Sequence, residues 1–287
     1  MQNAECRMQN ADAATPSILH SAFGILHFYA FALGAIVGSF LNVVIYRYPR
    51  EESIVFPGSH CPSCGAAIRW FDNIPIISFL VLRARCRACG APISWRYPLV
   101  ELANALFYLA LFLNTGPTPG FILIAATISL TIALIFIDAD IQILPDVIDL
   151  PGIAIGMAIG ALGLGAVYST LILSVSLVDA LLGAIFGAVI LVAIIGAYWL
   201  VRRAEGMGQG DVKMLAMIGA VLGWRSIPAV LLLASISGAV IGVPLALRSG
   251  RGMQLALPFG VFLGLSFLAV LFFGPTLSAW YLSLMTR

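Results

Sequence analysis

Charged residues are widely spaced along this chain, and long apolar segments lie between them. A helix needs about 20 apolar residues to cross the hydrocarbon core of a bilayer, so each gap of that length predicts one crossing. Membrane β-strands alternate polar and apolar residues, which these segments do not. We therefore predict an all-α polytopic membrane protein with about eight transmembrane helices. The predicted spans are residues 20–46, 98–114, 120–138, 150–170, 178–201, 211–224, 226–247 and 255–274.

Local features decide how the second and third spans are separated and whether the sixth span crosses the membrane. The gap between Glu101 and Asp138 is long enough for two helices, and the Gly-Pro-Thr-Pro-Gly sequence at 116–120 predicts the turn between them. The sixth span is short, because only the stretch from Met214 to Trp224 is uncharged there. A re-entrant segment is the alternative interpretation of that stretch.

The distribution of basic residues predicts the orientation. With eight crossings, 12 of the 15 Lys and Arg residues fall on one face and three on the other. Cytoplasmic loops carry an excess of Lys and Arg, so the face with 12 is predicted to be cytoplasmic and both termini to lie outside. A re-entrant sixth segment would move Arg248 and Arg251 to the other face and weaken this asymmetry.

Composition excludes a soluble enzyme. Hydrophobic residues make up 61% of the 287 residues and charged residues only 10%, whereas soluble domains contain about 45–50% apolar and about 25% charged residues. The same figures exclude a disordered chain. The net charge is only +2, so we expect no nucleic-acid partner. The expected partner of the apolar segments is the lipid bilayer.

The one sizeable polar segment, residues 48–97, contains two Cys-x-x-Cys pairs, each followed directly by glycine. Two such pairs can place four sulfurs around one tetrahedral ion, and a site with four protein ligands is structural because no position stays open for water. Two disulfides, or four buried thiols, are the alternatives. The predicted cytosolic location disfavours disulfides, so we expect zinc. The expected ligands are Cys61, Cys64, Cys86 and Cys89.

Carboxylates are concentrated at two places near the predicted cytoplasmic face. Asp138 ends the third span, and Asp140, Asp146 and Asp149 follow it; Asp149 is a candidate cap of the fourth span. Asp211 begins the sixth span. Two carboxylates that share a site cannot both ionise, which allows one to activate water while the other donates a proton, as in an aspartic protease. The alternative is that Asp138 and Asp211 only anchor helix ends at the membrane surface.

Glycines precede the second carboxylate. Gly208 and Gly210 flank Gln209, and Gly206 lies just before them. Residues without Cβ let another backbone approach closely, so we predict that Gly208 and Gly210 bind an extended peptide substrate beside Asp211.

Several motifs occur in order along the chain. They are Gly38–Arg47 (GSFLNVVIYR), Pro57–Cys64 (PGSHCPSC), Asp72–Pro75 (DNIP), Cys86–Cys89 (CRAC) with Ile93–Glu101 (ISWRYPLVE), the Asp138–Asp146 stretch, and Gly208–Asp211 (GQGD). In this order they resemble the motifs of the bacterial type IV prepilin peptidases, a GxGD aspartic protease family of bifunctional prepilin leader peptidases and N-methyltransferases. The resemblance covers residues 34 to about 264.

The resemblance implies that Asp138 and Asp211 are the catalytic pair and that the four cysteines are the family's zinc site. It implies cleavage of the basic leader of prepilins and pseudopilins at the cytoplasmic face of the bacterial inner membrane. It further implies methylation of the new N-terminal residue with S-adenosylmethionine, although no glycine fingerprint identifies cofactor-binding residues. This chain has Ala84 where the family typically has glycine.

The expected organisation is a flexible tail (1–19), a first transmembrane helix (20–47), a cytoplasmic tetracysteine zinc domain (48–97) and a transmembrane aspartic peptidase core (98–287). Other functions remain as alternatives: a peptidase without methyltransferase activity, a proton-coupled transporter, or a non-enzymatic scaffold. Four polar residues in the first two spans have two interpretations, interhelical hydrogen bonding or a part in binding. They are Ser39, Asn42, Glu101 and Asn104.

Overall fold

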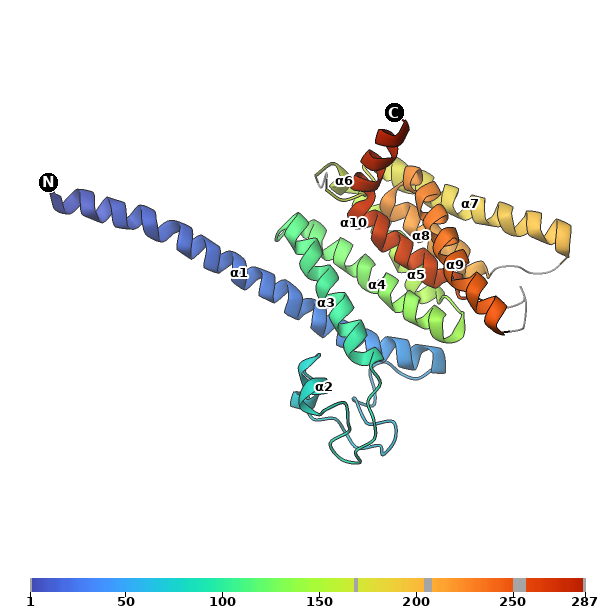
Figure 1. The fold of residues 1–287 in the computed structure, drawn as a ribbon, viewed down its shortest axis with the longest axis horizontal. Helices are drawn as coiled ribbons and strands as arrows, with labels where there is room; N and C mark the ends of the chain where they lie inside the picture. Colours follow the sequence, from blue (N-terminus) through green and yellow to red (C-terminus); the bar gives the residue numbers. More distant parts are fainter. Residues whose placement is uncertain (1, 168–169, 204–207, 250–256, 286–287) are drawn as a thin grey trace. The chain divides into compact units, whose positions relative to one another are not determined.

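Helices make up the regular structure of the described residues, and β pairing there is limited to two isolated bridges. The computed structural model describes residues 2–167, 170–203, 208–249 and 257–285 (Figure 1). It confirms the all-α class. The chain divides into two units: residues 1–40 with 57–116, and residues 41–56 with 117–287.

In the first unit, α1 (Gln2–Arg47) and α3 (Arg96–Thr115) pack closely because α1 carries two glycines four residues apart. A Cβ atom on Gly34 would lie 2.7 Å from the Cα of Ala105, and one on Gly38 would lie 2.7 Å from the Cα of Glu101. Asn104 donates a 2.7 Å hydrogen bond to the Gly34 carbonyl. The interhelical interpretation is therefore confirmed for Asn104.

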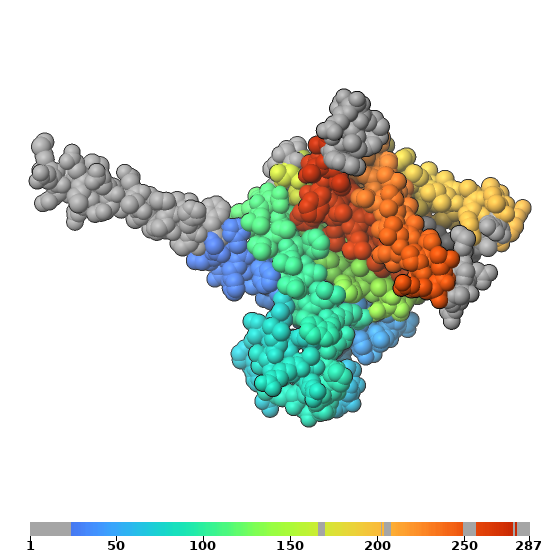
Figure 2. Space-filling view, viewed as in Figure 1, coloured from blue at the N-terminus to red at the C-terminus, as the bar shows by residue number. Residues whose placement is uncertain are grey.

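Residues 57–95 form a lobe of the first unit beyond the Arg96 end of α3 (Figure 2). It contains η2 (Trp70–Asn73) and the short helix α2 (Ile77–Val81), and the rest is turns and loops. Glycines and prolines are frequent in this segment, which favours turns over long helices.

The second unit is built around α8 (Gln209–Leu222), whose residues from 214 to 222 are all buried. Figure 1 shows α8 among its neighbours α5 (Asp146–Ala161), α7 (Leu177–Arg202), α9 (Ile227–Ser249) and α10 (Phe259–Met285), which contact it. The other helices of this unit are α4 (Pro119–Ile141), α6 (Leu164–Val167), η1 (Tyr48–Arg50) and η3 (Trp224–Ser226).

Glycines allow α8 to lie this close to its neighbours. On the α7 side, a Cβ atom on Gly183 would overlap the backbone of Gly219, and one on Gly187 would lie 2.6 Å from the Leu215 carbonyl oxygen. On the α5 side, a Cβ atom on Gly156 would lie 2.6 Å from the Cβ of Ala220. Small residues at such positions are how membrane helices approach backbone to backbone.

Six helices are long and apolar enough to cross a membrane among the described residues, at 24–50, 96–115, 119–141, 177–201, 224–248 and 259–277. The count of eight spans is not confirmed. The predicted spans 150–170 and 211–224 correspond to α5 and α8, which have 16 and 14 residues and are short for a full crossing.

Two boundaries test the sequence interpretation further. The predicted turn at 116–120 is confirmed, since α3 ends at Thr115 and Thr118 caps α4 by accepting a hydrogen bond from the Phe121 N–H. Helix α1 starts at Gln2, well before the predicted first span at residue 20, and it includes the segment for which a flexible tail was expected.

Candidate active site and metal centre

The lobe contains two turns with the same backbone structure, at residues 60–68 and 85–93. In the first, Cys61 N–H donates to the Ala66 carbonyl at 2.9 Å and Gly65 N–H donates to the Cys61 carbonyl at 2.8 Å. The second turn repeats both bonds 25 residues later, at 2.8 and 2.9 Å. We call these two turns the first and second knuckle. Each folds through hydrogen bonds that are local in sequence.

The knuckles bring the four predicted metal ligands together. The Sγ atoms all lie within 4.8 Å of one another, and the Sγ atoms of Cys61 and Cys89 are 3.9 Å apart. A tetrahedral site with Zn–S bonds of about 2.3 Å requires sulfurs about 3.8 Å apart, so the cluster fits one zinc-sized ion. None of the four is disulfide-bonded. The residues of the cluster are Cys61, Cys64, Cys86 and Cys89.

The first knuckle also favours the thiolate that a metal requires. Hydrogen bonds from the backbone N–H groups of Cys64 and Ser63 lower the pKa of the Cys61 thiol to about 6. A thiolate, rather than a thiol, is the metal ligand. The backbone therefore prepares at least this sulfur for binding before any ion is present.

A bidentate ion pair joins the second knuckle to η2. Arg87 donates from Nε to Asp72 Oδ2 at 2.8 Å and from Nη2 to Oδ1 at 2.6 Å. The hydrogen bond from Arg87 lowers the pKa of the Asp72 carboxyl. The motif residue Asp72 is thus a structural link between the metal cluster and the rest of the lobe.

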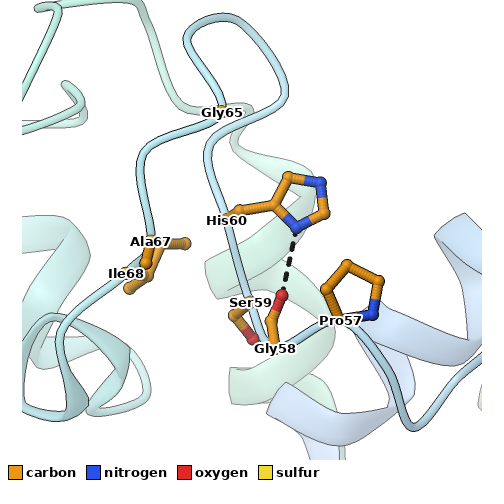
Figure 3. Close-up of a pocket in the computed structure, with 7 residues that line it drawn as sticks. All are labelled: Pro57, Gly58, Ser59, His60, Gly65, Ala67 and Ile68. Atoms are coloured by element: carbon orange, nitrogen blue, oxygen red, sulfur yellow. Dashed lines mark hydrogen bonds between the residues drawn. The ribbon is translucent and has the colours of Figure 1, made fainter.

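Beside the first knuckle, an open groove of about 440 Å³ runs along residues 57–60 (Figure 3). His60 Nδ1 lies 3.0 Å from the Gly58 carbonyl oxygen within it. The other lining residues are small or apolar: Pro57, Ser59, Gly65, Ala67 and Ile68. This lining offers no charged group that would identify a cofactor.

The residue that departs from the family pattern has an unusual backbone conformation. Ala84 has φ 56°, and Arg83 before it has φ 50°. Glycine reaches this left-handed region without steric cost, whereas other residues pay roughly 1–2 kcal/mol. The alanine therefore retains the conformation a glycine would provide, at a small cost in stability.

Asp138 lies in the last turn of α4, is 4% exposed, and contacts the start of α10. Its Oδ2 accepts a 3.0 Å hydrogen bond from the Val261 N–H, and the Gly260 N–H also donates to this carboxyl. The N–H groups of a first helical turn have no partner within the helix, so α10 supplies donors to Asp138. The space is narrow, because a Cβ atom on Gly260 would lie 2.8 Å from Oδ2.

Asp211 occupies the third position of α8, with Gly208 as the N-cap. Its carboxyl accepts a hydrogen bond from the Gly208 N–H. This is the acidic half of a capping box, in which the side chain at the third position satisfies the N-cap donor. Asp211 is buried and lies within electrostatic range of Asp138. The structure therefore places both predicted acids in one site.

Leu144 separates the two helix starts. A Cβ atom on Gly210 would lie 2.7 Å from Leu144 Cβ, and one on Gly260 would lie 3.0 Å from Leu144 Cδ1. The lack of a side chain at Gly210 is thus explained by packing against Leu144. Gly208 is different: it is exposed, and the nearest atoms to a Cβ there would be 3.9 Å away. Gly206 lies outside the described residues.

The remaining acidic residues of the 138–149 segment differ in how far their side chains are buried. Asp140 and Asp146 are exposed, as expected, and Asp146 pairs with Lys213 at 2.5 Å. Asp149 is fully buried, and its two carboxyl oxygens have no hydrogen-bond partner among the described residues. The expectation that Asp149 caps a helix is wrong: α5 begins at Asp146 with Pro145 as its N-cap, which places Asp149 inside the first turn.

Sequence reasoning missed Gly260 and Leu144. Both lie beside the two carboxylates, but Gly260 was expected only as part of the last span and Leu144 only as part of a loop. Leu144 directly precedes Pro145 and Asp146, and it is buried, as is Pro145, whereas residues 141–143 before it are exposed. The contacts of Leu144 with Gly210 and Gly260 join segments that are distant in sequence, so only the structure reveals them.

The knuckles generate a prediction about metal affinity. Gly65 and Gly90 have φ of 71° and 72°, with open space where a Cβ atom would be. Gly90→Ala should weaken zinc binding by about 1–2 kcal/mol, or roughly 5–30-fold, because an L-residue is strained at that φ. The measurement is competition with a chromophoric chelator. Gly58→Ala is the control, since Gly58 also has open space but no positive φ; equal affinities of the two variants would contradict the prediction.

Two family models match this chain. Residues 32–115 match the family described as the bacterial peptidase A24 N-terminal domain, and residues 121–243 match the type IV leader peptidase family. The first match contains the tetracysteine cluster and the second contains both buried aspartates. No solved structure matches the chain.

Curated proteins named prepilin leader peptidase/N-methyltransferase are similar over most of the chain. The protein of Aeromonas hydrophila is 38% identical over 293 residues, covering 93% of this chain and 98% of its own length. The protein of Myxococcus xanthus is 44% identical over 239 residues, covering 83% of this chain and 68% of its own length. The protein of Pseudomonas putida is 39% identical over 260 residues, covering 83% of this chain and 87% of its own length. With both family domains present and full-length similarity of this degree, the chain belongs to the prepilin leader peptidase/N-methyltransferase family.

Proposed function

We propose that this protein is a membrane-embedded aspartic endopeptidase that removes the basic leader from type IV prepilins and pseudopilins, with Asp138 and Asp211 as its catalytic pair. The observation that supports this most is that two buried carboxyl groups, from helices far apart in sequence, lie within electrostatic range of each other. Merely anchoring helix ends at a membrane surface would not require them to converge. Asp140 and Asp146 are exposed and serve as surface residues.

The chemistry follows from two carboxyl groups that share a site. Close carboxylates cannot both ionise, so the pair holds one proton. The ionised member accepts a proton from water as the water oxygen attacks the scissile carbonyl carbon, and the protonated member donates to the carbonyl oxygen. Collapse of the tetrahedral intermediate then breaks the C–N bond, and the amine leaves with a proton. Backbone N–H groups of α8 and α10 hold both carboxyl groups in place.

The second activity proposed is methylation of the new N-terminal amine, with S-adenosylmethionine as the methyl donor. The methyl group passes from the sulfonium sulfur to the nitrogen, and the nitrogen loses a proton. The names of the relatives support this activity, while the residues that bind the cofactor stay unassigned. A peptidase without this activity remains the alternative.

The location proposed is the bacterial inner membrane, with the active site at the cytoplasmic face. The excess of Lys and Arg that eight crossings would place at that face supports this orientation. The metal proposed for the tetracysteine cluster is zinc, in a structural role, because four sulfur ligands match its preferred tetrahedral site and leave no open position.

The aspartate assignment predicts the effect of two isosteric changes. Asp138→Asn and Asp211→Asn should each lower leader cleavage by at least about 10²-fold, because asparagine keeps the size of aspartate but cannot transfer the proton. The measurement is cleavage of a purified prepilin in detergent, with thermal unfolding as the check of folding. Asp140→Asn is the matched control and should cleave normally. Folded variants that still cleave would show that these acids are anchors.

The same variants separate the proposed activities. A pilin supplied with its leader already removed should still be methylated by Asp138→Asn from labelled S-adenosylmethionine, and absence of transfer by the wild type would support the peptidase-only alternative. A proton-coupled transporter would instead move protons into sealed liposomes without any pilin, and both Asn variants would stop that movement.

Gly260 provides a test of how Asp138 is positioned. Gly260→Ala should lower kcat for cleavage by about 10²-fold, because the added Cβ displaces a carboxyl group that must be placed to within about 1 Å. Gly196→Ala is the matched control, since Gly196 lies in α7 with open space around it. Wild-type kcat in Gly260→Ala would mean that the Gly260 contact does not position the catalytic carboxyl.

Gly208 provides a test of substrate approach. Gly208→Trp should abolish cleavage without unfolding the protein, because nothing in the fold crowds this exposed position while a large side chain would block a peptide beside Asp211. Gly196→Trp is the control for a bulky residue at an open glycine. Retained cleavage in folded Gly208→Trp would refute a substrate role for this glycine.

A further inference from the structure

Helix α2 is attached to α3 at a point inside a candidate membrane span. The span runs over Arg96–Thr115, and Glu101 lies five residues from its start, which is about 7.5 Å along a helix. Glu101 is buried, and its Oε2 accepts a 2.7 Å hydrogen bond from the backbone N–H of Ile76. The Ser39 hydroxyl also bonds to this carboxyl. The residue immediately before α2 is thus held at the depth of Glu101.

Ile76 has a strained conformation that this hydrogen bond helps to maintain. Its φ is 63° and its ψ is −50°, and Ile77 N–H donates to the Pro75 carbonyl at 2.6 Å. This is a γ-turn with positive φ, which is rare, and a β-branched residue is very uncommon there. Such strain persists only where the surroundings enforce it and often marks a functional element. Here it sharply redirects the chain into α2.

Helix α2 (Ile77–Val81) buries Phe79, partly buries Ser78 and exposes the other three side chains. Phe79 is buried, with its ring 4.7 Å from that of Trp95, the residue just before α3. Ile77, Leu80 and Val81 are 58%, 65% and 68% exposed. Figure 1 shows α2 beside the Arg96 end of α3. The helix therefore presents three large apolar side chains at the level where α3 enters the membrane.

We infer that α2 lies in the interfacial layer of the bilayer, with Ile77, Leu80 and Val81 in contact with lipid, and that Glu101 fixes it at this depth through Ile76. Contact with lipid explains why these three apolar side chains are exposed in the protein. Exposing them to water is unfavourable, and hydrocarbon is available at this level of the bilayer. Trp95 is 72% exposed at the same level, and tryptophan is enriched at membrane interfaces. The exposed Arg83 and Arg85 follow α2 and complement anionic head groups.

This inference changes the description of the zinc lobe and does not depend on the proposed peptidase activity. A cytoplasmic domain linked only by flexible loops would sample many orientations. A lobe that is attached to α3 and rests on lipid through α2 instead keeps the two knuckles at a constant height above the membrane surface.

The test is the depth of spin labels in nanodiscs of phosphatidylethanolamine and phosphatidylglycerol. Labels are placed singly at Leu80→Cys and Val81→Cys in a zinc-loaded Cys6→Ser background, in which the metal protects the four ligands. Leu113→Cys, on an exposed position within α3, is the lipid reference, and Ala67→Cys, exposed in the first knuckle, is the aqueous reference. Collision rates with oxygen and with a water-soluble nickel chelate give the depth.

The expected result is that the labels at 80 and 81 resemble the one at 113, with an oxygen-to-nickel collision ratio at least about tenfold above that at 67. A ratio like that at 67 would place α2 in water and overturn the inference. Low collision rates with both reagents would show that protein covers α2, which would also overturn it. Glu101→Leu removes the acceptor of the Ile76 bond and should shift the label at 80 toward water while leaving that at 113 unchanged.

Discussion

Backbone contact between helices is the constraint on which the site depends. Helix α8 is only 14 residues long and is surrounded by other helices because glycines remove the side chains between them, at Gly183 and Gly187 on α7 and at Gly156 on α5. In lipid there is no hydrophobic drive for apolar helices to associate, so close packing must supply the attraction. That packing fixes where α8 begins, and Asp211 stands in its first turn.

The two buried carboxyl groups, of Asp138 and Asp211, are held by the same kind of interaction. Each accepts hydrogen bonds from backbone N–H groups at the start of a helix, α10 for Asp138 and α8 for Asp211. Such donors are attached to the main chain and cannot rotate away as a side chain can, so the acids are oriented by the fold itself. Leu144 packs between the two helix starts and keeps them apart.

Local chemistry made much of this predictable. Asp138, Asp211 and the four cysteines were identified from their residue types and spacing, and the turn at 116–120 from its Gly and Pro content. The predicted count of eight spans is not confirmed, because α5 and α8 are apolar but have only 16 and 14 residues, and hydropathy does not distinguish protein from lipid neighbours. Gly260 and Leu144 belong to the site through contacts between distant segments. The turn at Ile76 was hidden for a related reason: its strain is offset by a hydrogen bond that the Ile76 N–H donates to Glu101, 25 positions away.

The likeness of the two knuckles has a consequence for how the metal centre assembles. Each knuckle forms a half-site of two sulfurs through bonds within nine residues, and the two halves repeat one backbone pattern at an offset of 25. Neither half needs the other in order to fold, so either can capture the ion first. Completion then requires the segment between the knuckles to bring the two halves together. The Asp72–Arg87 ion pair and the bond from Ile76 to Glu101 favour this arrangement, so the connection contributes to assembly through its own fixed contacts.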